Sequence, residues 1–473
     1  MTDKRPKVAI LSTWNEICGI AHFTKGIKEN LEETCDVEVL PTPRMILGNA
    51  KDGAEKEAAE NYCKYLARRV GEFDHVNIQF EPGILAGDMA TAMRRFKIIT
   101  KHAKSLSITW HYIARRKSTA PSEILRLVFQ GKVRYAAALM RSEAVLNSNW
   151  NTLFNYIRLR GRTIRISHIV HTKRDAHLVN ALFNHDAFSK RGEGRRHQPV
   201  SATPLTYLSD SQKSVFTKKL AQSELKNVMP KQTSKATRYI GVFGFFSGYK
   251  GFETAIDAVD SLPPEYELLM FSSVHESTLR IESRRDEYLG KLYDHINKRD
   301  KSIRSRNAEK AKEKIKLLTK MEAKGAKPTP ASTKLLDKAF EKKKALSERV
   351  HFLGAVSDDD LILGMMLCDA VLFPYINSPH TASGPTAQAI ELDRRVFASR
   401  NIQFVELAKF HENHFEFCDI GNSIEYAQKI PRMTKDRTDK IIHGYRVVDY
   451  PVQEREHNMA TAIEIYKRAV AHR

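Results

Sequence analysis

Short runs of apolar residues alternate along the chain with longer stretches in which apolar residues recur every three or four positions. In the first part of the chain, the runs that predict strands are residues 7–12, 36–40, 75–79, 105–110, 144–147 and 163–166. Residues 21–31 and 54–70 have the helical spacing. A continuous apolar run is typical of a strand buried on both faces, and strands that alternate with helices pair in parallel. The pattern therefore predicts a doubly wound α/β domain over residues 1–200.

The alternation weakens between residues 176 and 236, where we expect a linker over residues 201–236, and then begins again. The strands predicted in this second series are residues 239–243, 266–272, 350–353, 370–375, 395–399 and 414–418. Residues 252–262 have a helical spacing. Two such halves predict two Rossmann-like domains that face each other across a cleft, the second over residues 237–430. We expect helices in residues 431–473, the last of them packed back on the first domain.

One segment interrupts the second series. Residues 283–347 are rich in lysine, have a helical composition and are broken by Gly and Pro at residues 325–330. They stand where a strand would otherwise lead directly to the next strand. We interpret them as a basic helical insertion in the second domain, which serves either as a binding arm or as a solvated pair of charged helices.

Composition excludes several classes of protein. The 473 residues contain no apolar run near the roughly 18 residues that a membrane span needs. The amino-terminal residues lack the apolar core of a secretory signal. The five cysteines form no Cys-x-x-Cys pair, which argues against a zinc ribbon or a disulfide framework and favours a reducing compartment. We expect a cytoplasmic protein, with peripheral attachment to the inner membrane face as an alternative.

The charge is strongly positive and unevenly distributed. The formal net charge is +21, and residues 90–200 hold 22 Lys or Arg against 5 Asp or Glu. Residues 276–348 hold a further 21 against 12. Such a surplus attracts polyanions, namely nucleic acid, an anionic membrane surface or an acidic glycan. A surface adjusted only for solubility is the alternative interpretation.

The order of four stretches in the second half resembles the donor-binding domain of glycosyltransferase family four. These stretches are residues 241–251 (GVFGFFSGYKG), 350–361, 368–375 (CDAVLFPY) and 383–399 (SGPTAQAI and the run after it). Residues 17–21, 79–83 and 109–111 match weaker positions of the family in the first half. The resemblance implies the GT-B fold and the transfer of a hexosyl or pentosyl group from a nucleotide sugar, in most members with retention of configuration.

The resemblance also implies which residues bind the donor and how they act. The amino-terminal N–H groups of the helix after Ser383, together with Lys250, would hold the diphosphate and stabilise the charge that it gains as it leaves. Gly19 would allow backbone to approach the donor closely. The predicted donor-binding residues are Gly19, Phe246, Lys250, Ser383, Gly384, Pro385, Thr386, Gln388 and Glu391. The predicted catalytic residues are His111, Lys250 and His380, with His111 at the carboxyl end of a strand, where α/β sites form.

Two positions depart from the family pattern. Many members carry two glutamates with seven residues between them, and this sequence has His380 and Gln388 in their places, with Glu391 as a substitute if the register shifts. An amide can still bond ribose hydroxyls, because it both donates and accepts. The usual arginine of the first loop is also missing, and Phe245 or Phe246 stands near its place. These changes motivate an alternative hypothesis, a non-catalytic GT-B protein that binds a polyanion.

No metal site is expected. No Asp-x-Asp follows a predicted strand, and Asp358 to Asp360 have the pattern of a helix start. We expect a UDP-sugar as the donor, no further cofactor and no essential divalent metal.

The acceptor is expected on the basic first domain. The candidate residues there are Glu81, Arg94, Arg95, Arg115, Arg116 and Lys117. Basic residues interleaved with aromatic ones suit a phosphate backbone with stacked bases, and the sequence slightly favours a hydroxymethylated DNA base, which the enzyme would flip out of the duplex. The alternative is a glycolipid or surface glycan at an anionic membrane, because residues 124–140 have the pattern of an amphipathic surface helix.

Overall fold

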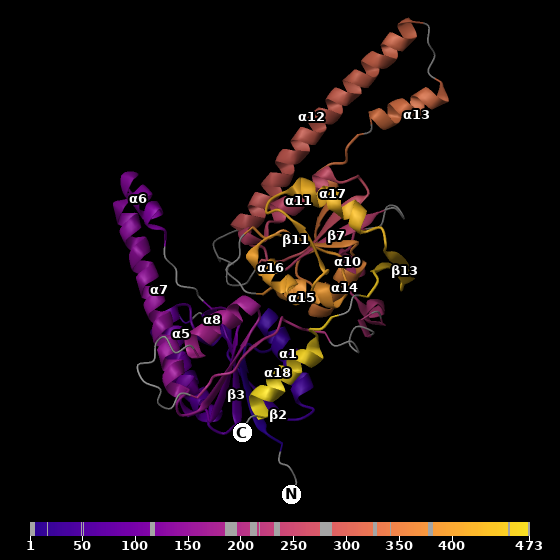
Figure 1. The fold of residues 1–473 in the computed structure, drawn as a ribbon. Coiled ribbons are helices and arrows are strands. Elements are labelled where there is room, and N and C mark those ends of the chain that lie inside the picture. The colour runs from indigo at the N-terminus through magenta and orange to yellow at the C-terminus, as the bar shows by residue number, and fades with distance from the viewer. Residues whose placement is uncertain are drawn as a thin grey trace.

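The computed structural model contains two parallel sheets flanked by helices (Figure 1). It describes residues 5–471 except residues 17, 49, 51, 114–118, 185–195, 209–214, 217, 231–236, 275–285, 325–328, 341, 377–381 and 453–454. The predicted α/β class and the two doubly wound sheets are confirmed.

The first sheet has six parallel strands in the order β2-β1-β3-β4-β5-β6. The strands are β1 (Lys7–Ser12), β2 (Asp36–Pro41), β3 (His75–Phe80), β4 (Ser105–Trp110), β5 (Arg165–Val170) and β6 (Val200–Ala202). The order reverses between β1 and β3, and such a switch point leaves a crevice at the carboxyl ends of the strands where ligands bind. Because β6 pairs with β5, the sheet extends into the segment predicted to be linker.

Helices cover both faces of the first sheet (Figure 1). They are α1 (Gly19–Leu31), α2 (Arg44–Leu47), α3 (Gly53–Val70), α4 (Pro82–Leu85), α5 (Met89–Ile99), the 3₁₀ turn η1 (Thr100–His102) and α8 (Lys173–Asn184). Residues of α3, α5 and α8 share one apolar core with alternate residues of the strands, such as Leu11 and Ile78. The opposite face, with Ile10, packs on Phe23 of α1. The continuous apolar runs of the sequence therefore serve two separate cores.

The second sheet repeats this plan in the order β12-β11-β10-β7-β8-β9, again with all strands parallel. Its strands are β7 (Arg238–Phe243), β8 (Tyr266–Phe271), β9 (Val350–Phe352), β10 (Ala370–Phe373), β11 (Val396–Ser399) and β12 (Phe415–Cys418). Its helices are α11 (Phe252–Ser261), α14 (Asp358–Leu367), α15 (Gly384–Glu391), α16 (Ile402–Ala408) and α17 (Ser423–Met433). Shorter turns are η3 (Leu220–Gln222), α10 (Leu225–Val228), η4 (Gly248–Lys250) and η6 (Leu346–Glu348). The switch point lies between β7 and β10.

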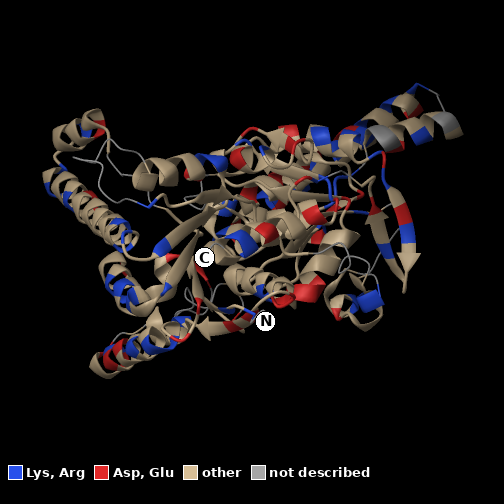
Figure 2. Cartoon of the chain, turned by 60° about the horizontal axis from the view of Figure 1, so that its bottom comes forward, with Lys and Arg blue, Asp and Glu red and all other residues tan. Residues whose placement is uncertain are grey.

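The lysine-rich segment forms two helices, α12 (Glu287–Ala323) and α13 (Pro330–Ala339), between β8 and β9. The first turns of α12 bury Leu292, Ile296 and Ile303 against the second domain. Ile303 is the last buried residue of α12. The rest of the helix projects away from the domain, and α13 returns beside it (Figure 1). Lys and Arg line this projecting part (Figure 2).

A second projection comes from the first domain. The helices α6 (Pro121–Phe129) and α7 (Val133–Arg160) extend beyond its body as a hairpin, which we call the α6–α7 hairpin (Figure 1). The strand predicted at residues 144–147 is wrong, because these residues lie inside α7. The run Ala-Val-Leu is too short to distinguish a strand from a helix, and α7 is defined instead by Trp150, Leu153 and Ile157 on its buried side.

The sequence predicted only helices in residues 431–473, but part of this segment forms strands. Residues 438–449 form an antiparallel pair, β13 (Thr438–Ile442) and β14 (Tyr445–Asp449). The helix α18 (Met459–Ala471) then lies beside α1, with the Tyr466 hydroxyl 3.0 Å from Thr109 Oγ1 of β4. One apolar cluster runs from Ile10 and Tyr466 to Phe373 and so joins the two domains.

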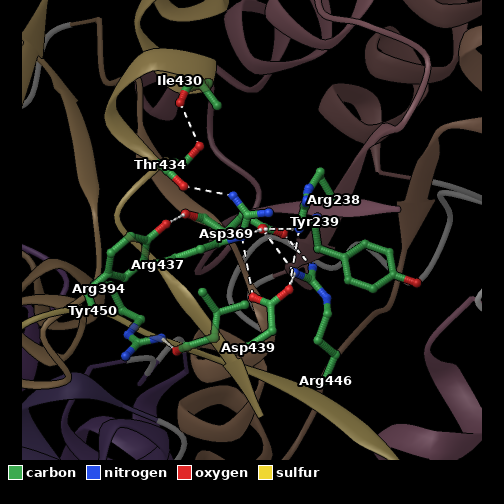
Figure 3. A network of polar contacts seen from close by, with 11 residues as sticks. Arg238, Tyr239, Asp369, Arg394, Ile430, Thr434, Arg437, Asp439, Arg446 and Tyr450 are labelled. Carbon is green, nitrogen blue, oxygen red and sulfur yellow. Dashed lines mark hydrogen bonds and ion pairs between the residues drawn. The ribbon is translucent and has the colours of Figure 1, made fainter. Parts of the chain in front are cut away.

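Asp369 is the centre of a buried ionic network that holds β13 and β14 on the second sheet (Figure 3). The residue is fully buried just before β10 and accepts from the Tyr239 N–H at 2.8 Å. Its carboxylate also pairs with Arg446 at 2.5 Å and with Arg437 at 3.0 Å. The Asp of the CDAVLFPY stretch is thus explained by the architecture, because it fixes the start of β10.

Candidate functional site

The amino-termini of two helices, one from each domain, approach each other where the domains meet. Gly19 is the first residue of α1 and Gly384 the first residue of α15. The Tyr207 hydroxyl lies between them and donates to the Gly19 carbonyl at 3.4 Å. A Cβ on Gly384 would lie 2.8 Å from this hydroxyl, so a larger residue there would require Tyr207 to shift. Both helix amino-termini carry partial positive charge, and their meeting point favours an anion.

Lys250 is the strongest candidate at this boundary. Only 8% of the residue is exposed, and its Nζ lies 3.3 Å from the Tyr375 hydroxyl. Burial lowers the pKa of its ammonium. Within the described part of the chain, no carboxylate raises that pKa in return, and the Tyr249 and Tyr375 rings are its nearby π-partners. A buried cation without an anion is costly, and a bound phosphate would supply the missing charge.

Two glycines allow Lys250 to reach this position. Gly251 has a φ of 66°, and a Cβ there would lie 2.1 Å from the Pro374 carbonyl oxygen. Gly244 has a φ of 106°, and a Cβ there would lie 2.4 Å from Lys250 Nζ. Each therefore combines a left-handed backbone with a close approach that only glycine permits. The "KG" pattern of the sequence thus brings the lysine against the carboxyl ends of β7 and β10.

Hydroxyl groups continue from Lys250 toward the start of α15. The Tyr375 hydroxyl lies 3.2 Å from Ser383 Oγ, which accepts from the Thr386 hydroxyl at 2.9 Å. Burial raises the pKa of Tyr375 to about 12, so it is protonated at neutral pH and can donate. Ser383 is the N-cap residue of α15, yet its side chain caps no backbone N–H of the helix. The first N–H groups of α15 therefore have no side-chain cap from Ser383.

Of three further predicted donor-binding residues, two lie on α15 and one lies in the core of the second domain. Gln388 is buried and its Nε2 lies 3.5 Å from His22 Nδ1 of α1, so it links the domains. Pro385 follows Gly384 in the first turn of α15. Phe246, in contrast, packs against Phe252 with ring centroids 5.2 Å apart. Phe246 thus belongs largely to the core of the second domain.

Glu391 requires a correction. Its two carboxylate oxygens accept from the backbone N–H groups of Tyr207 at 2.9 Å and Leu208 at 3.2 Å. The residue is buried at the far end of α15 from Ser383. Its carboxylate holds the segment between the domains, so Glu391 is not available to replace a donor-binding glutamate.

His111 lies just beyond β4 at the carboxyl edge of the first sheet. Its Nε2 lies 2.7 Å from Gln79 Oε1, and burial holds the pKa of its imidazole well below the usual range. The ring of His171, which follows β5, is 4.9 Å away between centroids. Neither Gln79 nor His171 was a predicted site residue. Gln79 stands at an alternate polar position of an apolar strand, which is a visible signal, whereas the position of His171 depends on the pairing of β4 with β5.

The acceptor-side candidates lie differently. Arg95 is 3% exposed and donates to the Leu47 and Leu85 carbonyls at 2.6 and 2.7 Å, so it is a structural residue and the prediction for it is wrong. Arg94 is half exposed and pairs with Glu60. Glu81 is partly exposed before α4. Four predicted site residues lie outside the described residues, namely Arg115, Arg116, Lys117 and His380.

Among the described residues, no three His, Cys, Asp or Glu side chains gather as metal ligands would. No helix in the described part of the chain is long and apolar enough to cross a membrane.

Two facing Rossmann-like domains, with the site at their boundary and the last helix returned to the first domain, define the GT-B fold. Solved structures share this arrangement. The Anabaena protein Alr3699/HepE in complex with UDP aligns over 98% of this chain and 95% of its own, with 15% identity and a TM-score of 0.50. The α,α-trehalose 6-phosphate synthase of Burkholderia multivorans aligns over 91% and 89%, with 10% identity and a TM-score of 0.51. No family model and no curated protein matches the sequence.

Proposed function

We propose that this protein transfers a hexosyl or pentosyl group from a UDP-sugar to an acceptor hydroxyl, with retention of configuration, as family four glycosyltransferases do. The observation that carries the proposal is Lys250, a buried ammonium whose charge no described carboxylate balances, placed beside the amino-terminus of α15. A nucleotide diphosphate is the ligand that balances this charge. The GT-B fold and the UDP held by the similar Anabaena protein support the same class of donor.

The chemistry follows from what each group can do. The diphosphate gains charge as the glycosidic bond breaks, and Lys250 with the first N–H groups of α15 stabilises that charge in a water-poor site. The Ser383 and Tyr375 hydroxyls add donors beside it. Gln388 lies farther along α15, where its amide suits the ribose hydroxyls. His111 approaches from the first domain, where a sugar hydroxyl can bond its ring.

The release of nucleoside diphosphate tests this proposal. UDP-, GDP- and ADP-sugars are each supplied alone, with anionic vesicles that contain a glycolipid acceptor, and with hydroxymethylated duplex DNA. We expect release of UDP from a UDP-sugar, stimulated by one acceptor. Tight binding of DNA or vesicles without release from any donor would instead support the non-catalytic alternative that His380 and Gln388 suggested.

For the acceptor, we propose a glycolipid or lipid-linked glycan at an anionic membrane. The α6–α7 hairpin carries both basic and apolar exposed side chains. In α6 and the first half of α7, the exposed large apolar ones are Leu125, Val128, Phe129, Val133, Tyr135, Met140 and Val145. Phe129, at the end of α6, is 87% exposed, and Arg126, Lys132, Arg134 and Arg141 stand among these residues. Basic residues suit DNA and an anionic membrane equally, but exposed aliphatic side chains gain free energy by inserting into the membrane and gain none from a charged phosphate backbone.

The double substitution Leu125→Ser with Phe129→Ser separates the two acceptors. Full burial of either side chain is worth about 1.5–3 kcal/mol, and partial insertion of both should still be worth one decade of affinity or more. We therefore expect binding to phosphatidylglycerol vesicles to fall at least about tenfold in a flotation assay, while DNA binding stays unchanged.

Ile441→Ser is the matched control, because Ile441 is 74% exposed on β13, away from the α6–α7 hairpin. It should leave vesicle binding as it is. If the wild-type protein binds DNA but not vesicles, the membrane proposal is wrong and the hydroxymethylated DNA base becomes the proposed acceptor. Equal losses of vesicle binding in the double variant and in Ile441→Ser would contradict the role of the α6–α7 hairpin in membrane binding.

A further inference from the structure

A row of polar side chains, which we call the polar file, lies along one face of the first sheet on β3 and β4 and ends at His111. Successive side chains of a strand point to opposite faces, so residues two apart share one face. On β3 the members are His75, Asn77 and Gln79, and on β4 they are Ser105, Ser107 and Thr109. The residues between them, such as Ile78 and Ile108, belong to the apolar core on the other face. The polar face carries α18, whose Tyr466 hydroxyl lies 3.0 Å from Thr109 Oγ1.

The hydrogen bonds of this file have one consistent direction. Asn77 Nδ2 donates to Ser107 Oγ at 2.8 Å and to Thr109 Oγ1 at 3.1 Å. Its Oδ1 accepts from Gln79 Nε2 at 2.6 Å. The Gln79 amide is therefore oriented with its oxygen toward His111, 2.7 Å from Nε2. An amide oxygen only accepts, so His111 Nε2 must carry a hydrogen.

Burial determines the rest of the protonation state. His111 is partly buried, and desolvation together with the neighbouring His171 keeps its pKa well below the usual range. A neutral imidazole has one N–H, and when that N–H is on Nε2, the lone pair is on Nδ1. His171 has its own fixed bond, with Nδ1 3.0 Å from the Thr203 carbonyl, so it donates there and does not compete for Gln79.

We propose that Gln79 is a positioning residue that holds the His111 ring as the Nε2–H tautomer and in one orientation. The contact of His111 with the donor sugar rests on the proposed function, whereas the tautomer rests only on the polar side chains of β3 and β4. Holding the ring in one tautomer and one orientation avoids a reorganisation cost when the sugar binds. Asn77 and Thr109 act one step farther away, because they orient the Gln79 amide.

The tautomer is measured directly by nitrogen-15 NMR of histidine-labelled full-length protein. The His111 signal is assigned as the one that is lost in His111→Asn. We expect Nε2–H in the wild type at neutral pH and a mixture of tautomers in Gln79→Met, which keeps the side-chain length but has no acceptor oxygen. Nδ1–H in the wild type, or an unchanged tautomer in Gln79→Met, would overturn the proposal.

Kinetics supply the second readout. In Gln79→Met we expect kcat to fall by about one to two decades, because a misplaced group near the reacting centre has effects of this size, with little change in the KM for the donor. The matched control is Gln198→Met, because Gln198 Oε1 makes an equivalent buried bond, 2.8 Å from His168 Nε2. The control should lose stability to a similar degree but keep kcat and the His111 tautomer.

The two readouts distinguish the inference from the function on which it builds. A loss of kcat in both variants alike would assign Gln79 a merely structural role and overturn the positioning proposal. A wild-type protein that shows the Nε2–H tautomer but releases no nucleotide from any donor would refute the proposed function, while the action of Gln79 on His111 would stand.

Discussion

The Lys250→Met variant should lose two to three decades of turnover and at least one decade of affinity for UDP, while its folded state becomes more stable. The loss of turnover follows because a charged donor aimed at a leaving group typically contributes about that much. The gain in stability follows because the variant removes a buried ammonium that no described carboxylate balances, and substitutions that relieve such functional strain are often worth on the order of 1 kcal/mol. Turnover is measured by UDP release, affinity by calorimetry and stability by thermal unfolding.

The gain in stability should depend on pH in a defined direction. Burial lowers the pKa of Lys250, so the folded state binds this proton less tightly than the unfolded chain does. Below the lowered pKa the ammonium is charged in both states, and its burial penalty is present in full. As the pH rises through the lowered pKa, the folded lysine loses its proton and the advantage of the variant should shrink.

An exposed lysine supplies the control for this variant. Lys64→Met, on the outer face of α3, should change neither UDP affinity nor turnover, and its stability should differ little from that of the wild type. Wild-type turnover in Lys250→Met would remove the assignment of Lys250 to the diphosphate. A loss of stability in Lys250→Met would show that the ammonium has a structural partner instead.

The Asp369→Ala variant should be destabilised by about 3–5 kcal/mol, the largest expected change in stability. Removing one side of a buried ionic network leaves the opposite charges unpaired, and here the charges are the guanidinium groups of Arg446 and Arg437 (Figure 3). The Tyr239 N–H would lose its acceptor as well. Urea unfolding, followed by the fluorescence of the full-length protein, measures the effect.

The same network contains its own control. Asp439 is 36% exposed and touches the same arginines from the solvent side. Because water and the remaining Asp369 compensate, Asp439→Ala should cost no more than about 1 kcal/mol. Equal effects of the two substitutions would contradict the assignment of Asp369 as the centre of the network.

The local pattern of apolar residues was sufficient to predict most of the strands of the two sheets. The apolar runs at residues 7–12 and 105–110 coincide with β1 and β4, and the helical spacing of residues 54–70 differs by one residue from α3. These elements are long or fully buried, so their periodicity is strong. The strand predicted at residues 144–147 was wrong because it rested on a run of only three apolar residues, which is too short to show a period. Residues 438–449 were wrongly predicted to be helical because their two strands have only five residues each, which is too short for a clear alternation, and only β13 is exposed while β14 is largely buried.

The site was predictable only as far as chain neighbours define it. Lys250 and Gly251, like Ser383 and Gly384, are adjacent in the sequence, and their positions after a strand end or at a helix start follow from the local pattern. Arg95 could not be assigned, because its bonds go to two carbonyls that are 10 and 48 residues away.

The sequence by itself determined that the chain forms two doubly wound α/β halves and that a lysine and a helix start stand at the ends of the second-half strands. Only the tertiary structure decided how the two halves combine. It placed Tyr207 between Gly19 and Gly384, and it paired the Glu391 carboxylate with backbone N–H groups of the segment that joins the domains. It also aligned the polar residues of β3 and β4 in a row that ends at His111. The physical reason is that periodicity reports which face of an element is buried, whereas the partner of a buried polar group is chosen by strand register and domain packing.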